Sequence, residues 1–110
     1  MDISFKNNKL RKQCTEDKRA KRDLGQNMAK KLKQRLDDLK AAPTLETMKP
    51  PMPGRCHELK GDRKGQFSVD LVAQWRLLFE PVDTESKSEG GVNWDSVKAI
   101  KILEIEDTHE

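Results

Sequence analysis

Apolar residues recur in the first half of the chain with the spacing of an α-helix. Five of them follow one another at intervals of four, four, four and three residues: Leu24, Met28, Leu32, Leu36 and Leu39. Such intervals place all five on one helical face, and most of the residues between them are good helix formers. Pro43 ends the helix because its ring interrupts the backbone hydrogen bonding. The stripe therefore predicts a helix that packs on the core.

The second half of the chain changes to strict alternation, which is typical of β-strands. Apolar and polar residues alternate over residues 66–71 and again over 75–80, so each strand has one core face and one polar face. Gly61–Gly65 supplies turn residues before the first of these strands, and Pro81 ends the second. A last strand, rich in Ile and Leu, is expected over residues 97–105.

Shorter elements complete the first half. Alternate apolar positions predict a small strand over residues 2–5, and a short helix is expected over 7–14. Segment 15–22 is polar apart from one alanine, and we interpret it as a charged connector or a frayed continuation of that helix. Residues 44–49 are expected to form one helical turn, and the Pro-rich run 50–54 is a rigid connector.

The order of elements predicts the fold class. Residues 55–60 are expected to form a strand, and the Ser-, Gly- and acid-rich segment 82–96 a long loop or hairpin tip. Consecutive strands joined by short turns make antiparallel sheets, and helices cover one face of such a sheet. We therefore expect a single α+β domain over residues 1–110. Its N-terminal strand and two helices pack on one face of a small antiparallel sheet of about four strands.

Charge is distributed unevenly along the 110 residues. The net charge is +3, but residues 1–40 carry 13 Lys and Arg against 6 Asp and Glu. This basic part favours a polyanion or an acidic protein as partner, although charged helices commonly expose such faces to solvent alone. No apolar run approaches the ~20 residues of a membrane span, and the start lacks a signal-peptide core. We expect a cytoplasmic protein, without a membrane partner, whose Cys14 and Cys56 stay reduced.

Residues able to do chemistry gather in the middle of the chain and near its end. The run His57–Gly65 (HELKGDRKG) precedes the strand Trp75–Phe79 (WRLLF), and the segment 107–109 (DTH) lies close to the last residue. No Walker loop, dinucleotide-binding fingerprint, nucleophile elbow or zinc-knuckle spacing is present. The sequence thus argues against the enzyme classes that depend on those motifs.

This arrangement resembles the HigB-type killer proteins of plasmid maintenance systems, in the RelE/ParE superfamily of toxins. In that family an H-x-L-K-G-D-R-K-G run precedes a Trp-Arg-apolar-apolar-Phe strand and a closing Asp-Tyr-His. An upstream L-x-x-L-x-x-A pattern is matched by Leu36, Leu39 and Ala42. The resemblance implies a RelE-like fold and a type II toxin that cleaves mRNA, typically on the ribosome, as a metal-independent endoribonuclease without a cofactor. It also implies a cognate antitoxin, expected to be a helix-turn-helix protein.

The residue types suit RNA cleavage by the RNA's own 2′-OH. The reaction needs a base for that hydroxyl, an acid for the leaving 5′-oxygen and cations for the negative phosphorane. Histidine is the acid or base that titrates near neutral pH, and arginine grips two phosphate oxygens at once. The residues expected to be catalytic are His57, Lys60, Arg76, Asp107 and His109. The residues expected to bind RNA are Arg63, Lys64, Lys30 and Lys33.

Strand geometry constrains how these residues meet. His57 and Lys60 are three residues apart, so they point to opposite faces of an ideal strand. A strand that ends near Gly61 would let Lys60 or Arg63 turn toward His57. Arg76 lies on the polar face of its strand, and we expect the whole group to line one hollow around a phosphate.

Two other functions stay open. One is a non-enzymatic inhibitor of DNA gyrase, like the ParE-type toxins, which would need an interaction surface instead of a catalytic cluster. The other is an RNA-binding member with weakened activity, because Thr108 stands where the family has a tyrosine. Trp94 has two candidate roles, a replacement stacking surface and an anchor of the 82–96 loop on the core, and we favour the anchor.

Cysteine chemistry and metal binding are not expected. Cys56 adjoins His57, yet neighbouring residues of a strand face opposite ways and are poorly placed to share a proton. The same two residues with Cys14 and His109 show no spacing typical of a metal site.

Overall fold

The computed structural model describes residues 1–82, 87–88 and 91–108 of the chain. Its helices are α1 (Asn8–Thr15), α2 (Asp17–Leu24) and α3 (Gln26–Ala41). Its strands are β1 (Asp2–Phe5), β2 (His57–Glu58), β3 (Phe67–Asp70), β4 (Trp75–Pro81), β5 (Lys87–Ser88), β6 (Gly91–Val92) and β7 (Ala99–Asp107). Short 3₁₀ turns lie at Leu45–Met48, Gly61–Arg63 and Trp94–Ser96.

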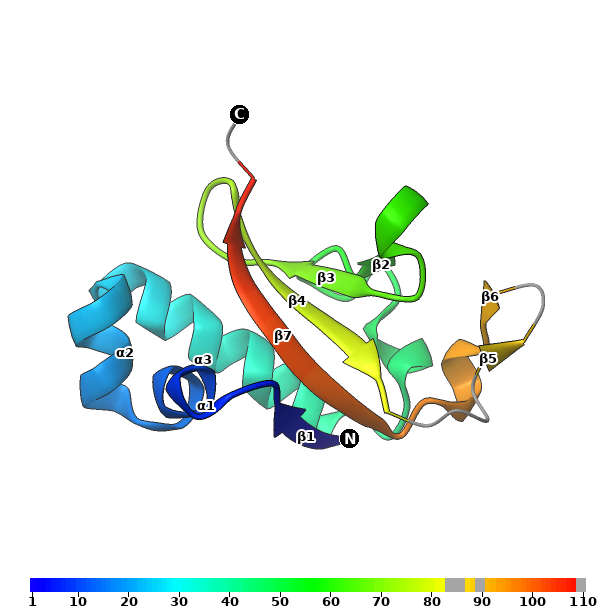
Figure 1. Cartoon of the computed structure of the whole chain (residues 1–110), viewed down its shortest axis with the longest axis horizontal. Coiled ribbons are helices and arrows are strands. Elements are labelled where there is room, and N and C mark those ends of the chain that lie inside the picture. Colours follow the sequence, from blue (N-terminus) through cyan, green and yellow to red (C-terminus); the bar gives the residue numbers. More distant parts are fainter. Residues whose placement is uncertain (83–86, 89–90, 109–110) are drawn as a thin grey trace.

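The main sheet has five strands in the order β1–β7–β4–β3–β2 (Figure 1). β2, β3, β4 and β7 pair antiparallel, as expected, whereas β1 lies parallel to β7 at one edge. The predicted α+β class is confirmed, with a third helix. The N-terminal strand was expected to pack on one face of a four-stranded sheet, but it joins the sheet as its fifth strand. Parallel neighbours need a long crossover connection, and here everything between β1 and β7 forms that crossover. A four-residue alternating pattern does not reveal such a distant partner.

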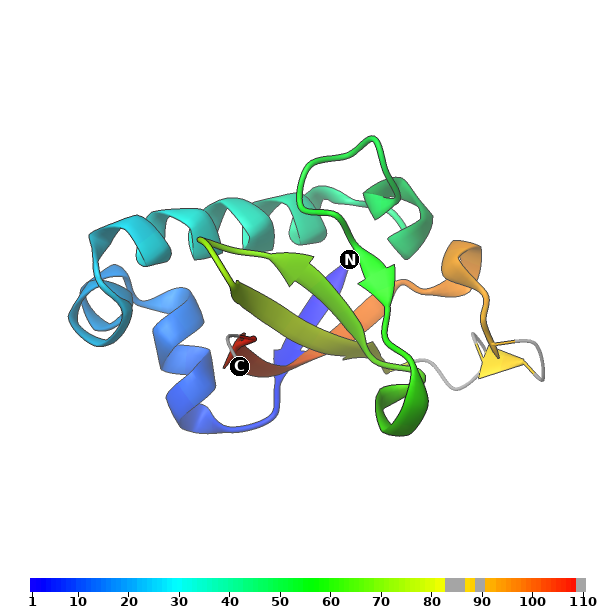
Figure 2. The same cartoon turned by 90° about the horizontal axis from the view of Figure 1, so that it is seen from above.

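α3 packs along one face of the sheet, and the stripe that predicted it forms the helical side of the core. It meets the alternating apolar residues of the strands: Phe67, Val69, Leu77, Phe79, Ile100 and Ile102. Figure 2 shows α3 on one side of the sheet and the Gly61–Arg63 turn on the other. We call the sheet face opposite α3 the open face.

A glycine divides the basic N-terminal helices. The polar segment 15–22, expected to be a charged connector or a frayed helix, is helical over most of its length. It contributes the last residue of α1 and most of α2. Gly25 ends α2 and begins α3 with a φ of 84° and a ψ of 162°. Leu24 therefore belongs to α2 and not to the helix predicted from the leucine stripe.

The strand limits differ from the predicted ones at both ends of the sheet. β2 covers only two of the residues in 55–60, because Arg55 has a positive φ of 48° that strands do not adopt. β7 runs two residues beyond Ile105 and so includes Glu106 in the sheet. Trp94 packs edge-to-face on Phe67, with ring centroids 4.9 Å apart, which agrees with its expected role as a core anchor.

Candidate active site on the open face of the sheet

Cross-strand pairing gathers polar side chains on the open face. Arg76 of β4 pairs with Asp70 of β3 on one side and with Glu106 of β7 on the other. Directly paired residues of neighbouring strands share a face, so these three side chains project together, away from α3. On β2, His57 pairs with Ser68. Because Ser68 is two residues from Asp70 along β3, His57 projects from the same face.

Glu106 binds two arginines at the centre of this face. Arg63 grips it with both terminal nitrogens, Nη1 at 2.8 Å from Oε2 and Nη2 at 2.6 Å from Oε1. Arg76 places Nε and Nη2 at 2.8 Å and 2.7 Å from Oε2. The hydrogen bond from Arg63 lowers the pKa of Glu106 below its usual range, and Arg76 adds to this effect against the opposing influence of burial. Glu106 is therefore a carboxylate shared between two guanidinium groups.

Asp70 forms a second ion pair at the end of β3. Arg55 donates from Nε to its Oδ2 at 3.0 Å, and this hydrogen bond raises the pKa of Arg55. From the α3 side, the buried Arg35 donates from Nε to the backbone carbonyl of Asp70 at 2.7 Å. Gly54 allows this approach, because a Cβ there would lie 3.1 Å from Nε of Arg35. The end of β3 is thus held from both faces of the sheet.

His57 is half-buried, and its tautomer follows from its partner. Its Nδ1 lies 2.9 Å from the backbone carbonyl oxygen of Arg55. A carbonyl oxygen only accepts hydrogen bonds, so Nδ1 carries the proton and Nε2 of the neutral ring is free of it. His57 on β2 and Arg76 on β4 are separated by two strand spacings across the sheet and by two residue positions along the strands. At ordinary strand spacings this corresponds to about 12 Å between their Cα atoms.

The turn after β2 brings Arg63 over the open face, as a strand ending near Gly61 would allow. Lys60 and Lys64 flank the turn and are both exposed. Arg63 lines a hollow of about 340 Å³ together with Leu78 and Glu104. Arg63 is thus the residue that connects the turn, the hollow and the arginine cluster.

The C-terminal residues are placed differently from the expectation. Asp107 pairs with Trp75, so its side chain starts on the face opposite Arg76 and Glu106. Thr108 holds the end of β7 against the β3–β4 turn, because its amide and its hydroxyl both donate to the carbonyl oxygen of Gln74. His109, the other tail residue expected to be catalytic, lies outside the described residues.

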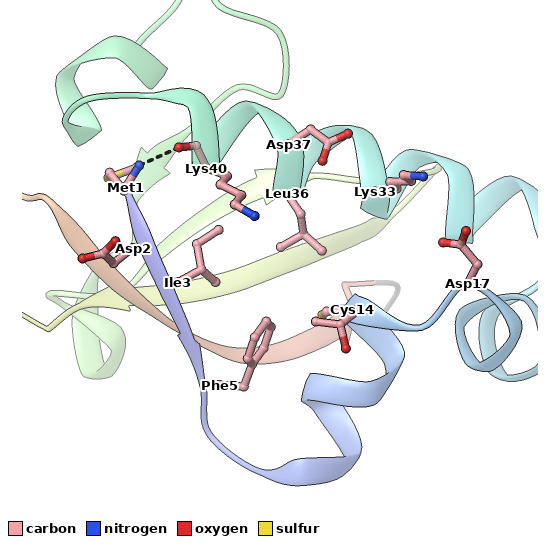
Figure 3. Close-up of a pocket in the computed structure, with 11 residues that line it drawn as sticks. Met1, Asp2, Ile3, Phe5, Cys14, Asp17, Lys33, Leu36, Asp37 and Lys40 are labelled. Atoms are coloured by element: carbon pink, nitrogen blue, oxygen red, sulfur yellow. Dashed lines mark hydrogen bonds between the residues drawn. The ribbon is translucent and has the colours of Figure 1, made fainter.

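The two helical lysines expected to bind RNA lie on the other side of the molecule. Lys30 and Lys33 are exposed on α3. Lys33 borders a hollow of about 580 Å³ between β1, α1 and α3, with Phe5 and Leu36 among its apolar lining (Figure 3). This hollow is larger than the one beside Arg63, and among the described residues neither hollow is lined by one that was expected to be catalytic. The structure therefore separates these lysines from the open face.

Glu106 and the Arg55–Asp70 pair were missed in the sequence. The signal for Glu106 was present, because Glu104 and Glu106 alternate with Ile105 as they would in a continuing strand. The predicted strand ended at residue 105, so it did not include this signal. For Arg55 no comparable pattern exists, since its position depends on a positive φ at the start of β2.

The described residues also bear on thiol chemistry, metal binding and membrane insertion. Burial raises the pKa of both Cys14 and Cys56 to about 12, so neither thiol ionises readily near neutral pH. Among residues 1–82, 87–88 and 91–108, no three His, Cys, Asp or Glu side chains gather as metal ligands. No helix in the same ranges is both long and apolar enough to cross a membrane.

Comparison with known proteins agrees with the resemblance seen in the sequence. No curated protein matches the chain. Among solved structures, the YoeB/ParE toxin from Agrobacterium tumefaciens superposes with a TM-score of 0.62 over 99% of this chain and 100% of its own, at 13% identity, which shows a shared fold. The family described as "RelE-like toxin of type II toxin-antitoxin system HigB" matches residues 3–88. Because this match covers more than half of the chain, the protein belongs to the HigB family of RelE-like toxins of type II toxin–antitoxin systems.

Proposed function

We propose that this toxin is a metal-independent endoribonuclease that cleaves mRNA on the ribosome. The observation that carries the proposal is the convergence of Arg63 and Arg76 on one anion, Glu106, on the open face, where Arg63 also lines a hollow. His57 projects from the same face. Two guanidinium groups and an imidazole that project from one face of the sheet are the groups that phosphodiester cleavage by a 2′-OH needs.

In this proposal each group has a separate task. The arginine pair binds the scissile phosphate and stabilises the charge that accumulates on its oxygens. His57 accepts the 2′-OH proton at Nε2, which is the unprotonated nitrogen of its neutral ring. The 2′-oxygen then attacks phosphorus, and the products are a 2′,3′-cyclic phosphate and a 5′-hydroxyl. Lys60 lies in the turn beside the site and adds positive charge.

The acid for the leaving 5′-oxygen is proposed to come from the C-terminal tail. His109 follows Thr108, which lies two residues after Glu106. The amide of Thr108 donates a hydrogen bond to the carbonyl oxygen of Gln74 in the β3–β4 turn. Asp107 starts on the opposite face of the sheet, so we propose that it acts on the tail instead of on the phosphate.

A type II toxin has an antitoxin as its partner, and we propose a helix-turn-helix protein for that role. Translating ribosomes place the substrate in the cytoplasm. The exposed Lys30 and Lys33 of α3 would then contact ribosomal RNA phosphates, which gives affinity without sequence preference. Lys64 in the turn would contact the mRNA itself.

The proposal is tested by His57→Ala and His57→Asn variants. Both remove the proposed base, whereas the asparagine retains a donor for the Arg55 carbonyl oxygen. A lost general base lowers rates by about 10²–10⁴-fold, so we expect both variants to lose growth inhibition on induction. The new mRNA 5′ ends produced by the wild type should disappear in both.

The control for folding is co-purification with the antitoxin, which both variants should retain. Unchanged toxicity and unchanged mRNA ends in both variants would reject the nuclease. DNA damage with intact mRNA in cells that express the wild type would instead support inhibition of DNA gyrase.

A further inference from the structure

The Arg63–Glu106–Arg76 cluster has the geometry of an occupied anion site. Arg63 makes two parallel contacts to the two carboxylate oxygens, at 2.8 Å and 2.6 Å, which is the fork arrangement by which arginine also binds phosphates. Arg76 adds two contacts to the same carboxylate at 2.8 Å and 2.7 Å. A carboxylate and a phosphodiester both present two oxygens and one negative charge to such a pair.

The cluster is accessible to an external anion. The Arg63 and Arg76 side chains retain 41% and 24% of their exposure, and Glu106 retains 16%. Two guanidinium groups and one carboxylate sum to a charge of +1, and the negative charge of Glu104 acts through space on Arg63 and offsets part of it. The neighbouring Arg55 is already paired with Asp70.

The direction of the two arginines is also informative. Glu106 is on β7, whereas His57 is on β2, three strands further along the sheet. Glu106 therefore draws both guanidinium groups toward β7, away from the strand that carries the proposed base. A phosphate that binds between the arginines and His57 has to compete with Glu106 for the same guanidinium groups.

We propose that Arg63 and Arg76 form a phosphodiester-binding site whose anion position is filled by Glu106 in the free toxin, so that RNA binds by displacing this carboxylate. The inference rests on the proposed function and adds Glu106 as a competitor of the RNA phosphate for the two arginines. Glu106 keeps the affinity of the toxin for RNA low until a substrate phosphate replaces it.

The test compares Glu106→Gln with Glu104→Gln in the full chain. Glu104 is two residues away on the same strand, is exposed and acts on Arg63 through space. Its substitution therefore controls for the loss of one negative charge near the site. The probe is a fluorescein-labelled 2′-deoxy oligonucleotide, which lacks the nucleophile and cannot be cleaved. We expect fluorescence anisotropy to show about tenfold tighter binding for Glu106→Gln and at most about twofold for Glu104→Gln.

Equal or weaker binding by a folded Glu106→Gln variant would overturn the proposal, since Glu106 would then only support the arginines. If that variant fails to fold, the wild type is titrated with a deoxydinucleotide and followed by NMR. The Nε–H resonances of Arg63 and Arg76 and the carboxyl carbon of Glu106 are expected to shift together. Absence of that joint shift at saturating binding overturns the proposal.

The two proposals fail separately. The oligonucleotide cannot be cut, so the binding result does not depend on catalysis. Tighter binding by Glu106→Gln together with full toxicity of His57→Ala would leave the anion site standing and reject the proposed nuclease. Loss of toxicity in His57→Ala with unchanged binding by Glu106→Gln would do the reverse.

Discussion

Glu106 shares its carboxylate between two arginines that are 43 and 30 residues away in the sequence. Its effect on the molecule is electrostatic, because its contacts with both arginines are ion pairs. The two arginines lower its pKa, so the folded chain binds the carboxylate form more strongly than the protonated form. This residue therefore links the stability of the domain to pH.

The sign of that link gives a prediction. A carboxyl group whose pKa is lowered by folding stabilises the native state above its ordinary pKa, and this contribution is lost as pH falls through the folded pKa. The ordinary Glu pKa is about 4.3. Urea unfolding should therefore show that wild type exceeds Glu106→Gln in free energy of unfolding at pH 7, and that the difference shrinks below about pH 4.

Glu104→Gln is the control for this measurement, and its difference from wild type should change less with pH. A difference for Glu106→Gln that stays constant between pH 7 and pH 3 would contradict the ion pairs described for Glu106.

At the scale of elements, the break between α2 and α3 depends on the backbone of one residue. Gly25 has a φ of 84° and a ψ of 162°, a region of backbone conformation that is almost confined to glycine. A Cβ at this position would meet no atom within 4 Å. Any cost of a side chain there is therefore conformational and not steric crowding by neighbours.

Gly25→Ala should lower the free energy of unfolding by about 1–3 kcal/mol. Chemical denaturation with unchanged m-value is the measurement. Gln26→Ala, one residue further and exposed in the first turn of α3, is the matched control and should change stability little. Equal stability of Gly25→Ala and wild type would show that the α2–α3 boundary can adopt another conformation.

At the scale of the whole molecule, positive charge lies on two sides of the sheet. The open face carries the Arg63–Arg76 pair, and α3 carries the exposed Lys30 and Lys33 on the other side. A short oligonucleotide bound at the open face does not reach across the sheet to α3. The two groups of cations are therefore separable by experiment.

A double variant, Lys30→Glu with Lys33→Glu, should bind a short 2′-deoxy oligonucleotide as wild type does, within about twofold, and should bind ribosomes less well. Anisotropy and ribosome co-sedimentation measure the two effects. Arg76→Gln is the complementary variant, and it should weaken oligonucleotide binding. Loss of oligonucleotide binding by the lysine double variant would show that the nucleic acid contacts both sides.

Much of the architecture was predictable from local pattern. The leucine stripe predicted α3, and the alternation over 66–71 and 75–80 predicted β3 and β4 together with the face that carries Arg76. Periodicity predicts these features because burial of one face is the main contribution to the stability of each element. The HELKGDRKG run indicated the family that the comparison then showed.

The partners across long sequence separations were decided only by the tertiary structure. Alternation assigns a residue to a face, but the register between β4 and β7 decides that Glu106, and not Asp107, meets Arg76. The path of the turn decides that Arg63 joins them, and the crossover through three helices decides that β1 lies beside β7. The sequence by itself predicted α3, β3 and β4, the face that carries Arg76, and the resemblance to the family. The meeting of the charges depended on packing of the whole chain, because electrostatic contacts form between groups that no local period relates.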